Sequence, residues 1–190
     1  DYNENNPVLW FEKSQMSGDK IHLISNTETR ELDSLKIDGR VFIIEKDSLS
    51  ENGFQQIKGG NLRGAFVASK LDQIVITKNT EMVYYLYNDE DLQLIGIDKT
   101  TCSALSMQFE EGQIGEITFL VSPNGNVYPE EELPENDRTL KGFTWRFAQR
   151  PERIEDLFDE NDREEQFPEI LKFQYPAAKQ LPTPTDKPKE

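Results

Sequence analysis

One spacing of apolar residues recurs three times along this chain, and it constrains the fold more than any single residue does. The pattern is a leucine, an apolar residue nine positions later, and two more apolar residues three and five positions beyond that. The second copy begins 39 residues after the first and the third begins 43 residues after the second. A repeat of this length indicates stacked supersecondary units that bury a shared core by packing on their neighbours. The copies are Leu23/Leu32/Leu35/Ile37, Leu62/Leu71/Ile74/Ile76 and Leu105/Ile114/Ile117/Phe119.

The last two apolar residues of each copy lie two positions apart, which is the period of a β-strand and not of a helix. The positions between them carry Lys36, Val75 and Thr118, so the opposite face is mixed to polar. We therefore predict an all-β fold of stacked β repeats. Its middle strands should direct six side chains to one interior, namely Leu35, Ile37, Ile74, Ile76, Ile117 and Phe119.

Each copy is expected to hold about three short strands, since strands average about 5–6 residues. Residues typical of turns separate the second and third strands, at 38–39, 78–80 and 123–125. The expected strands are 20–24, 35–37 and 41–44 in the first copy, 62–68, 72–77 and 82–87 in the second, and 102–109, 114–121 and 126–128 in the third.

The start of the chain resembles the closing strand of a repeat, because Val8–Phe11 matches residues 41–44 and 83–86 in its continuous apolar character. We expect residues 1–17 to be the end of a preceding repeat and residues 18–150 to form the β-repeat domain. A sheet that begins on such a strand should have an unpaired edge, which can recruit another strand.

The repeat pattern stops after residue 128, and three further segments follow. Residues 140–147 are expected to form one more strand, with Phe143, Trp145 and Phe147 on one face. Pro151 suits the first turn of a helix, so residues 151–175 are expected to be a short acidic C-terminal helix. Residues 176–190 contain Pro182, Pro184 and Pro188 and are expected to be a flexible tail.

Charge excludes several classes of partner. The 190 residues carry a formal net charge of −15, so nucleic acids and anionic membrane surfaces should be repelled. No stretch approaches the roughly 20 apolar residues that span a bilayer, and the N-terminus does not resemble a signal peptide. The single cysteine, Cys102, excludes an internal disulfide and leaves the compartment open.

Few residues suit catalysis. His22 is the only histidine and alternates with apolar neighbours in an expected strand, so an exposed strand position is favoured over a general base. Cys102 has no partner in the sequence that would lower its pKa, which favours a packing role over a nucleophile. We predict that the protein is not an enzyme and has no catalytic residue, metal site or cofactor.

Three other motifs have a structural and a functional interpretation. The acidic sequence 159–162 lacks the ligand order and glycine of an EF-hand, so a solvated acidic face is favoured over calcium binding. The glycine-rich sequence 59–64 precedes a strand and favours a turn and bulge over a phosphate cradle. Tyr84, Tyr85 and Tyr87 suit cross-strand packing better than sugar stacking.

The inward-facing apolar residues of the three repeats can form one of two structures. If the two sides of the repeat stack pack against each other, these residues form a closed core. If the two sides stay apart, the residues line an apolar groove for acyl chains. The residues expected to line such a lipid groove are Leu23, Leu35, Ile37, Leu62, Ile74, Ile76, Leu105, Ile117 and Phe119.

Residues 32–41 and 71–81 resemble the repeats of the OstA-like and LptA-like lipopolysaccharide-transport (organic solvent tolerance) family. Residues 94–103, 128–130 and 140–146 look like the C-terminal part of the OstA-like proteins of Bacteroidetes. The resemblance covers roughly residues 8–150. Its motifs are structural repeats, which specify a fold better than an activity.

The resemblance implies a twisted, half-open β-jellyroll, or taco, in a periplasmic protein of the cell envelope. Lipopolysaccharide or another envelope lipid would place its acyl chains along the inner apolar surface during outer-membrane assembly. Other proteins of the transport machinery would bind at the sheet edges, and no catalytic residue is implied. The alternative is a structural or protein-interaction β domain with a closed core and no lipid ligand.

Overall fold

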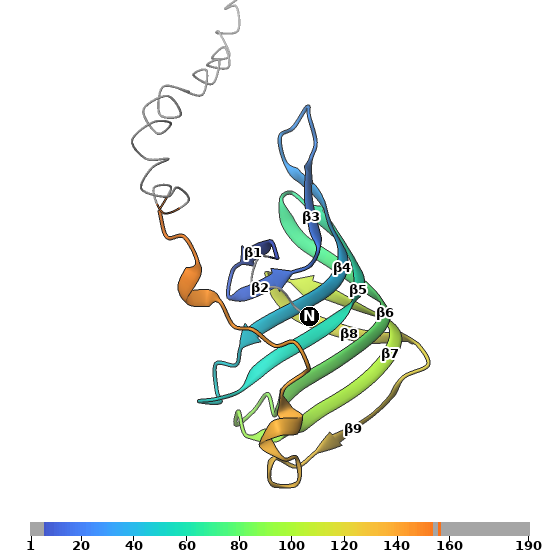
Figure 1. The fold of residues 1–190 in the computed structure, drawn as a ribbon, viewed down its shortest axis with the longest axis vertical. Helices are drawn as coiled ribbons and strands as arrows, with labels where there is room; N and C mark the ends of the chain where they lie inside the picture. Colours follow the sequence, from blue (N-terminus) through green and yellow to red (C-terminus); the bar gives the residue numbers. More distant parts are fainter. Residues whose placement is uncertain (1–5, 154–155, 157–190) are drawn as a thin grey trace, which may run out of the picture. The chain divides into compact units, whose positions relative to one another are not determined.

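The computed structural model describes residues 6–153 and 156, and it confirms the all-β prediction. The chain divides into two compact units, residues 1–148 and 149–190. The described part of the first unit forms one nine-stranded antiparallel sheet (Figure 1). The strands are β1 (Val8–Phe11), β2 (Ser14–Ser17), β3 (Lys20–Ser25), β4 (Leu32–Lys46), β5 (Phe54–Val67), β6 (Lys70–Tyr87), β7 (Leu94–Glu110), β8 (Gln113–Val121) and β9 (Asn124–Tyr128), followed by the 3-10 turns η1 (Glu130–Glu132), η2 (Glu135–Arg138) and η3 (Phe147–Gln149).

The four long strands β4 to β7 lie side by side, and the short strands share partners at both ends of the sheet. The first half of β4 pairs with β3 and its second half with β2, which in turn pairs with β1. In the same way, the first half of β7 pairs with β9 and its second half with β8. β1 pairs only with β2, so among the described strands its other edge is unpaired.

The long strands β4 to β7 are interrupted along one line that crosses the sheet. The ladder between β4 and β5 shifts register between Asp38 and Val41, and the ladder between β5 and β6 shifts opposite Lys78 and Asn79. At the two ends of the sheet the interruption is complete, because β2 and β8 end there and β3 and β9 begin there. An extra residue in one strand bends it and increases its twist. The sheet therefore folds over along this line.

The expected turns at 38–39 and 78–80 are wrong, because β4 and β6 each run straight through them. Gly39 and Arg40 have φ of 73° and 45°, and Lys78 and Asn79 have φ of 68° and 52°. In both strands the two consecutive left-handed residues form a bulge and do not reverse the chain. The third expected turn, at 123–125, is also wrong as a reversal: the strand breaks at 122–123, but β8 and β9 both pair with β7 and run in the same direction.

Glycine is required where β5 crosses the bend. A Cβ on Gly59 would lie 2.5 Å from Cγ2 of Ile76, so a larger residue would force the neighbouring strand away. The glycine-rich sequence 59–64 therefore serves the bulge between β5 and β6, in agreement with the structural interpretation.

The bend divides the sheet into two halves, and we name them by their contents. The repeat half consists of β3, β8 and residues 32–38, 61–67, 70–77 and 104–110. The strap half consists of β1, β2, β9 and residues 41–46, 54–59, 80–87 and 94–102.

Each copy of the sequence repeat is one hairpin of the repeat half. In the second and third copies the first and last members face each other, as Leu62 with Ile76 and Leu105 with Phe119. In the first copy Leu23 faces Leu35, and Ile21 takes the place opposite Ile37. This register shift of two residues moves Leu23 out towards the hairpin end. Its side chain is 48% exposed, whereas Leu62 and Leu105 are fully buried.

The inner faces of the two halves pack on each other to form the main core. Leu35, Ile37, Ile74 and Ile76 are buried in this core, and Ile117 and Phe119 pack against it while partly buried. These are the six residues that were predicted to share one interior, and the prediction is confirmed.

Residues 129–147, which we call the strap, cover the outer face of the strap half (Figure 1). The predicted strand at 140–147 is wrong, since the strap contains no strand. Two buried glutamines bind its backbone instead. Gln56 accepts a hydrogen bond from Leu140 N (2.9 Å) and donates one to Arg138 O (2.8 Å). Gln15 does the same with Arg146 N (2.6 Å) and Thr144 O (2.8 Å).

Side chains of the strap form a second apolar cluster on this outer face. Leu133 and Leu140 are buried there, and Phe143 and Trp145 pack against the cluster. The strand residues beneath them are Phe42, Ile44, Val83, Tyr85 and Ile97. The expected helix, the acidic sequence 159–162 and the proline-rich tail lie outside the described residues, apart from positions 151–153 and 156.

Candidate functional site

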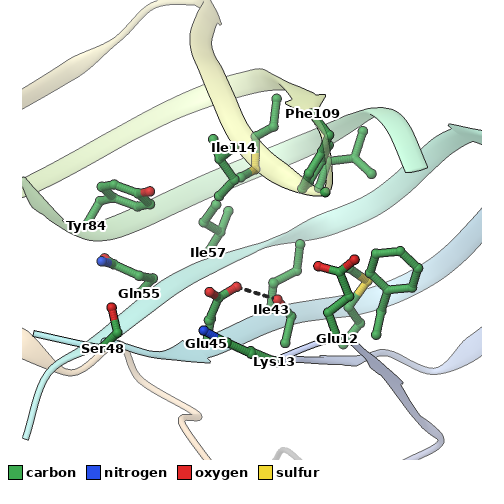
Figure 2. Close-up of a pocket in the computed structure, with 16 residues that line it drawn as sticks. Glu12, Lys13, Ile43, Glu45, Ser48, Gln55, Ile57, Tyr84, Phe109 and Ile114 are labelled. Atoms are coloured by element: carbon green, nitrogen blue, oxygen red, sulfur yellow. Dashed lines mark hydrogen bonds between the residues drawn. The ribbon is translucent and has the colours of Figure 1, made fainter. Parts of the chain in front are cut away.

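A cavity of about 630 Å³ lies between the inner faces of the two halves, farther from the bend than the packed core (Figure 2). Next to the bend the faces are in full contact, and Ile37, Leu62 and Ile76 are completely buried. The cavity begins one or two residue pairs farther out. Two faces joined along a bend separate with distance from it, so the same strands that form the core also form the cavity walls.

The floor of the cavity is apolar. The strap half contributes Ile43 and Ile57, which face each other across β4 and β5. The repeat half contributes Ile74 and Met107, which face each other across β6 and β7. Further apolar side chains reach the cavity from the strand ends, namely Phe11, Met16, Tyr84, Phe109 and Ile114.

The mouth of the cavity is polar and carries more negative than positive charge. The turn between β1 and β2 supplies Glu12 and Lys13, and the end of β4 supplies Glu45 (Figure 2). Ser14 Oγ donates a hydrogen bond to Glu45 Oε2 at 2.6 Å. A ligand would therefore place an apolar segment inside and a polar group beside these residues.

Tyr84 stands at one end of the cavity, beside Gln55 (Figure 2). Burial raises the pKa of its phenol, and the negative charges of Glu45 and Asp47 raise that pKa further. The phenol is therefore neutral at physiological pH and offers a hydroxyl group, not a charge, to the cavity.

A second cavity of about 310 Å³ adjoins the first, and the two share Tyr84 and Ile114 as lining residues. It lies between the last part of β6 and β8, with Met82, Leu86 and Phe119 among its walls. The two cavities together follow the open side of the bent sheet, from the β1–β2 turn to the edge strand β8.

The predicted groove residues divide into three groups. Ile74 lines the larger cavity, and Ile117 and Phe119 line the smaller one. Leu23 is exposed on the projecting end of β3. The remaining five are packed in the closed core, namely Leu35, Ile37, Leu62, Ile76 and Leu105.

Sequence reasoning missed most of the residues that line the larger cavity. Ile57 lies in the first part of β5, which none of the three repeat copies includes. Met107 and Phe109 continue the alternation that begins at Leu105, so this signal was present but was not used. Ile43 was assigned to a closing strand, and only the bend brings that strand opposite β7 and β8.

The candidate catalytic residues are on different faces of different strands. His22 is exposed on β3 and pairs with Lys36 on the outer face of the repeat half. Cys102 is buried in the main core on β7, where burial raises the pKa of its thiol. Among the described residues, no group of three or more His, Cys, Asp or Glu side chains is arranged to hold a metal ion.

The three tyrosines of β6 do not form one stacking surface. Tyr84 faces the cavity, whereas Tyr85 is buried in the cluster beneath the strap. Tyr87 donates a hydrogen bond from its hydroxyl to Asp47 Oδ1 at 2.8 Å, and this bond and burial raise its pKa. The arrangement fits cross-strand packing.

The comparisons with known proteins found no family model, no curated protein and no solved structure that matches this chain. In the described part of the chain, no helix is long and apolar enough to cross a membrane. The interpretation of the site therefore depends on its geometry.

Proposed function

We propose that this protein is a non-enzymatic scaffold of the cell envelope that binds an acyl chain of lipopolysaccharide or of another envelope lipid. The observation that carries this proposal is the cavity of about 630 Å³ with an aliphatic floor and a polar mouth. This size lies within the range of about 300–1,000 Å³ that is typical of small-molecule sites. The adjoining cavity extends the same surface towards β8.

The gain from such binding is hydrophobic. Each buried methylene contributes about 0.8 kcal/mol, so about ten methylenes would contribute about 8 kcal/mol before the costs of immobilising the chain. The floor residues Ile43, Ile57 and Ile74 are on paired strands of a packed sheet, so the cavity is preformed and its reorganisation costs are small.

The bent, half-open sheet is also the architecture implied by the resemblance to the OstA-like and LptA-like family. A place in the periplasm and a role in outer-membrane assembly belong to the same proposal. Partner proteins of a transport machinery would pair with β1 or β8, which are the two ends of the strand order.

One observation favours the alternative of a structural or protein-interaction domain. Six of the nine expected groove residues, Ile74 included, are packed in the core with at most 2% of their surface exposed. In this alternative the cavities are packing gaps and the sheet edges carry the function.

Titration with N-phenyl-1-naphthylamine, a neutral apolar probe that fluoresces in apolar sites, distinguishes the lipid-binding scaffold from the structural or protein-interaction domain. Ile114→Trp fills the boundary between the cavities, and Leu23→Trp places the same side chain on an exposed position of the same half. We expect Ile114→Trp to weaken probe binding at least tenfold and Leu23→Trp to leave it unchanged. Absence of probe binding, or equal binding by both variants, would support the alternative.

A further inference from the structure

Glu45 is an acidic residue of the cavity mouth that has no cationic partner among the described residues. Its side chain extends from the inner face of β4 into the mouth and is partly buried (Figure 2). Its carboxylate accepts a hydrogen bond from Ser14 Oγ through Oε2. Among the described residues, no Lys, Arg or His nitrogen lies within 4.0 Å of this carboxylate.

Two acidic residues of the outer faces, Glu81 and Asp38, differ from Glu45 in this respect. Glu81 is paired with Lys58 at 2.9 Å, and Asp38 is paired with Arg63 at 2.6 Å. Both pairs join neighbouring strands on the outside of the sheet. A cationic group of a ligand would therefore supply Glu45 with the charged partner that the described residues do not.

Glu12 is the second acidic residue at the mouth. It lies on the β1–β2 turn, and its carboxylate rests close to Gly112 on the β7–β8 turn. Lys13 is also at the mouth, but it makes no ion pair with Glu45. The protein as a whole has a net charge of −15, which further disfavours an anionic group at this place.

We infer that the cavity selects a single-chain lipid whose polar end is an amine, with Glu45 binding the ammonium group. This inference rests on the proposed function, because it takes the acyl chain to lie on the floor formed by Ile43, Ile57 and Met107. An ammonium group has three donors and no acceptor. Glu45 Oε1 and the Ser14 oxygen can accept two of these hydrogen bonds, and water at the open mouth can accept the third.

The same geometry rejects acyl chains that end in a phosphate or carboxylate. Such a group would lie beside Glu45 and Glu12 at the edge of an apolar cavity, where like charges are poorly screened. Among the lipids that the proposed function admits, those with an amine near the chain are therefore favoured over those with phosphate there.

The test uses three twelve-carbon ligands that differ only at their polar end, dodecylamine, dodecanol and dodecanoate. Each competes with bound N-phenyl-1-naphthylamine at pH 7 and below its micelle concentration. We expect dodecylamine to displace the probe at a concentration at least tenfold lower than dodecanoate. Dodecanol should lie between them.

Variants assign the selectivity to Glu45. Glu45→Gln should weaken dodecylamine about tenfold, strengthen dodecanoate and leave dodecanol unchanged. Glu45→Lys should reverse the preference, which keeps the test decisive if the first variant perturbs the fold. The matched control is Glu28→Gln, which makes the same change of net charge on the exposed turn between β3 and β4 and should have no effect.

The outcomes separate this inference from the proposed function. If none of the three ligands displaces the probe, both are overturned. If all three displace it equally, or dodecanoate does so best, the acyl-chain site stands and the amine inference is overturned. If Glu28→Gln lowers dodecylamine affinity as much as Glu45→Gln does, the preference reflects net charge and the assignment of Glu45 is overturned.

Discussion

The two halves of the sheet are made from the same long strands, yet they bury their faces differently. The repeat half packs its inner face into the core, and its outer face is mainly polar, with Lys36, Arg63 and Thr118 in one row. The strap half is apolar on both faces, because the strap covers the outer one. A single strand such as β4 or β6 therefore meets two environments on either side of its bulge.

The amino-acid pattern of each long strand reflects this difference in the burial of the outer face. Residues 34–37 alternate between polar and apolar, which is typical of a strand with one solvated face. Residues 41–44 and 82–86 are continuously apolar, which is typical of a strand buried on both faces. The change occurs at the bulge, where the strand passes from one half to the other.

The comparison also explains where the cavity lies. The strap covers the apolar outer face of the strap half. The inner face of that half packs against the repeat half only near the bend. The open space is thus confined to the inner side, away from the bend. Four predictions test this division, in decreasing order of the expected effect.

The largest effect is expected at the shared core beside the bend. Ile76 is completely buried between the halves, so Ile76→Ala should lower the free energy of unfolding by about 2–5 kcal/mol. Leu23→Ala is the control, since Leu23 is 48% exposed and should change stability by less than about 0.5 kcal/mol. Urea denaturation measures both, and a similar loss in the two variants would contradict the division into core and projecting hairpin.

The strap should be held in place by the hydrogen bonds that Gln56 of β5 and Gln15 of β2 make with its backbone. Gln56→Ala leaves Leu140 N and Arg138 O without their partner, and it should cost about 1–3 kcal/mol. Hydrogen exchange should accelerate in residues 138–146 and remain unchanged in β8. The control is Gln73→Ala, which removes a hydrogen bond to Ser106 Oγ from the outer face of the repeat half. Uniform acceleration across the sheet in Gln56→Ala would show that the strap is not a separate element.

The strap half should be sensitive to alkaline pH. Burial raises the pKa values of Tyr84, Tyr85 and Tyr87 above the ordinary value of about 10, so the folded protein holds these phenols neutral. Their contribution is complete below about pH 10 and is lost as the pH rises from there through the folded pKa values. Denaturation at a series of pH values should show this fall.

Tyr87→Phe provides the comparison for the alkaline fall. It removes one of the three phenols, so the free energy of unfolding should decrease less steeply above about pH 10 than in the parent protein. An identical pH dependence in the two proteins would contradict a contribution from Tyr87.

The smallest effect on the fold is expected at the sheet edges. If the protein associates, Val8→Lys on β1 should weaken the association, because a lysine on an edge strand disfavours pairing with another chain. Leu120→Lys tests the opposite edge at β8, and sedimentation measures both variants. A protein that is monomeric at all concentrations would contradict association through either edge.

Much of the fold could be predicted from local pattern. The period of two in residues 35–37, 74–76 and 117–119 identified strands and the face that they bury, because alternation is a property of each strand alone. The turns expected at 38–39 and 78–80 lie where the structure has left-handed residues, at Gly39 and Arg40 and at Lys78 and Asn79, and there the strands bend and continue. The sequence did not distinguish a bulge from a reversal, because both use the same local conformations and differ in where the next strand finds its partner.

The candidate site was less predictable for the same reason. The apolar pattern identifies Leu62 and Ile57 equally as inward-facing, yet the first is in the closed core and the second lines the cavity. The acidic mouth combines Glu12 from one turn with Glu45 from the end of a strand 33 residues later.

The sequence by itself thus determined that the chain is a β protein and which residues of the repeated strands face inward. These properties depend on neighbours within a few positions, whose side chains alternate by covalent geometry. Only the tertiary structure decided which inward-facing rows close into core and which remain apart. That outcome depends on the angle between two sheet halves, and the angle results from packing between residues far apart in the chain, such as Ile43 of the strap half and Met107 of the repeat half, which belong to one core cluster.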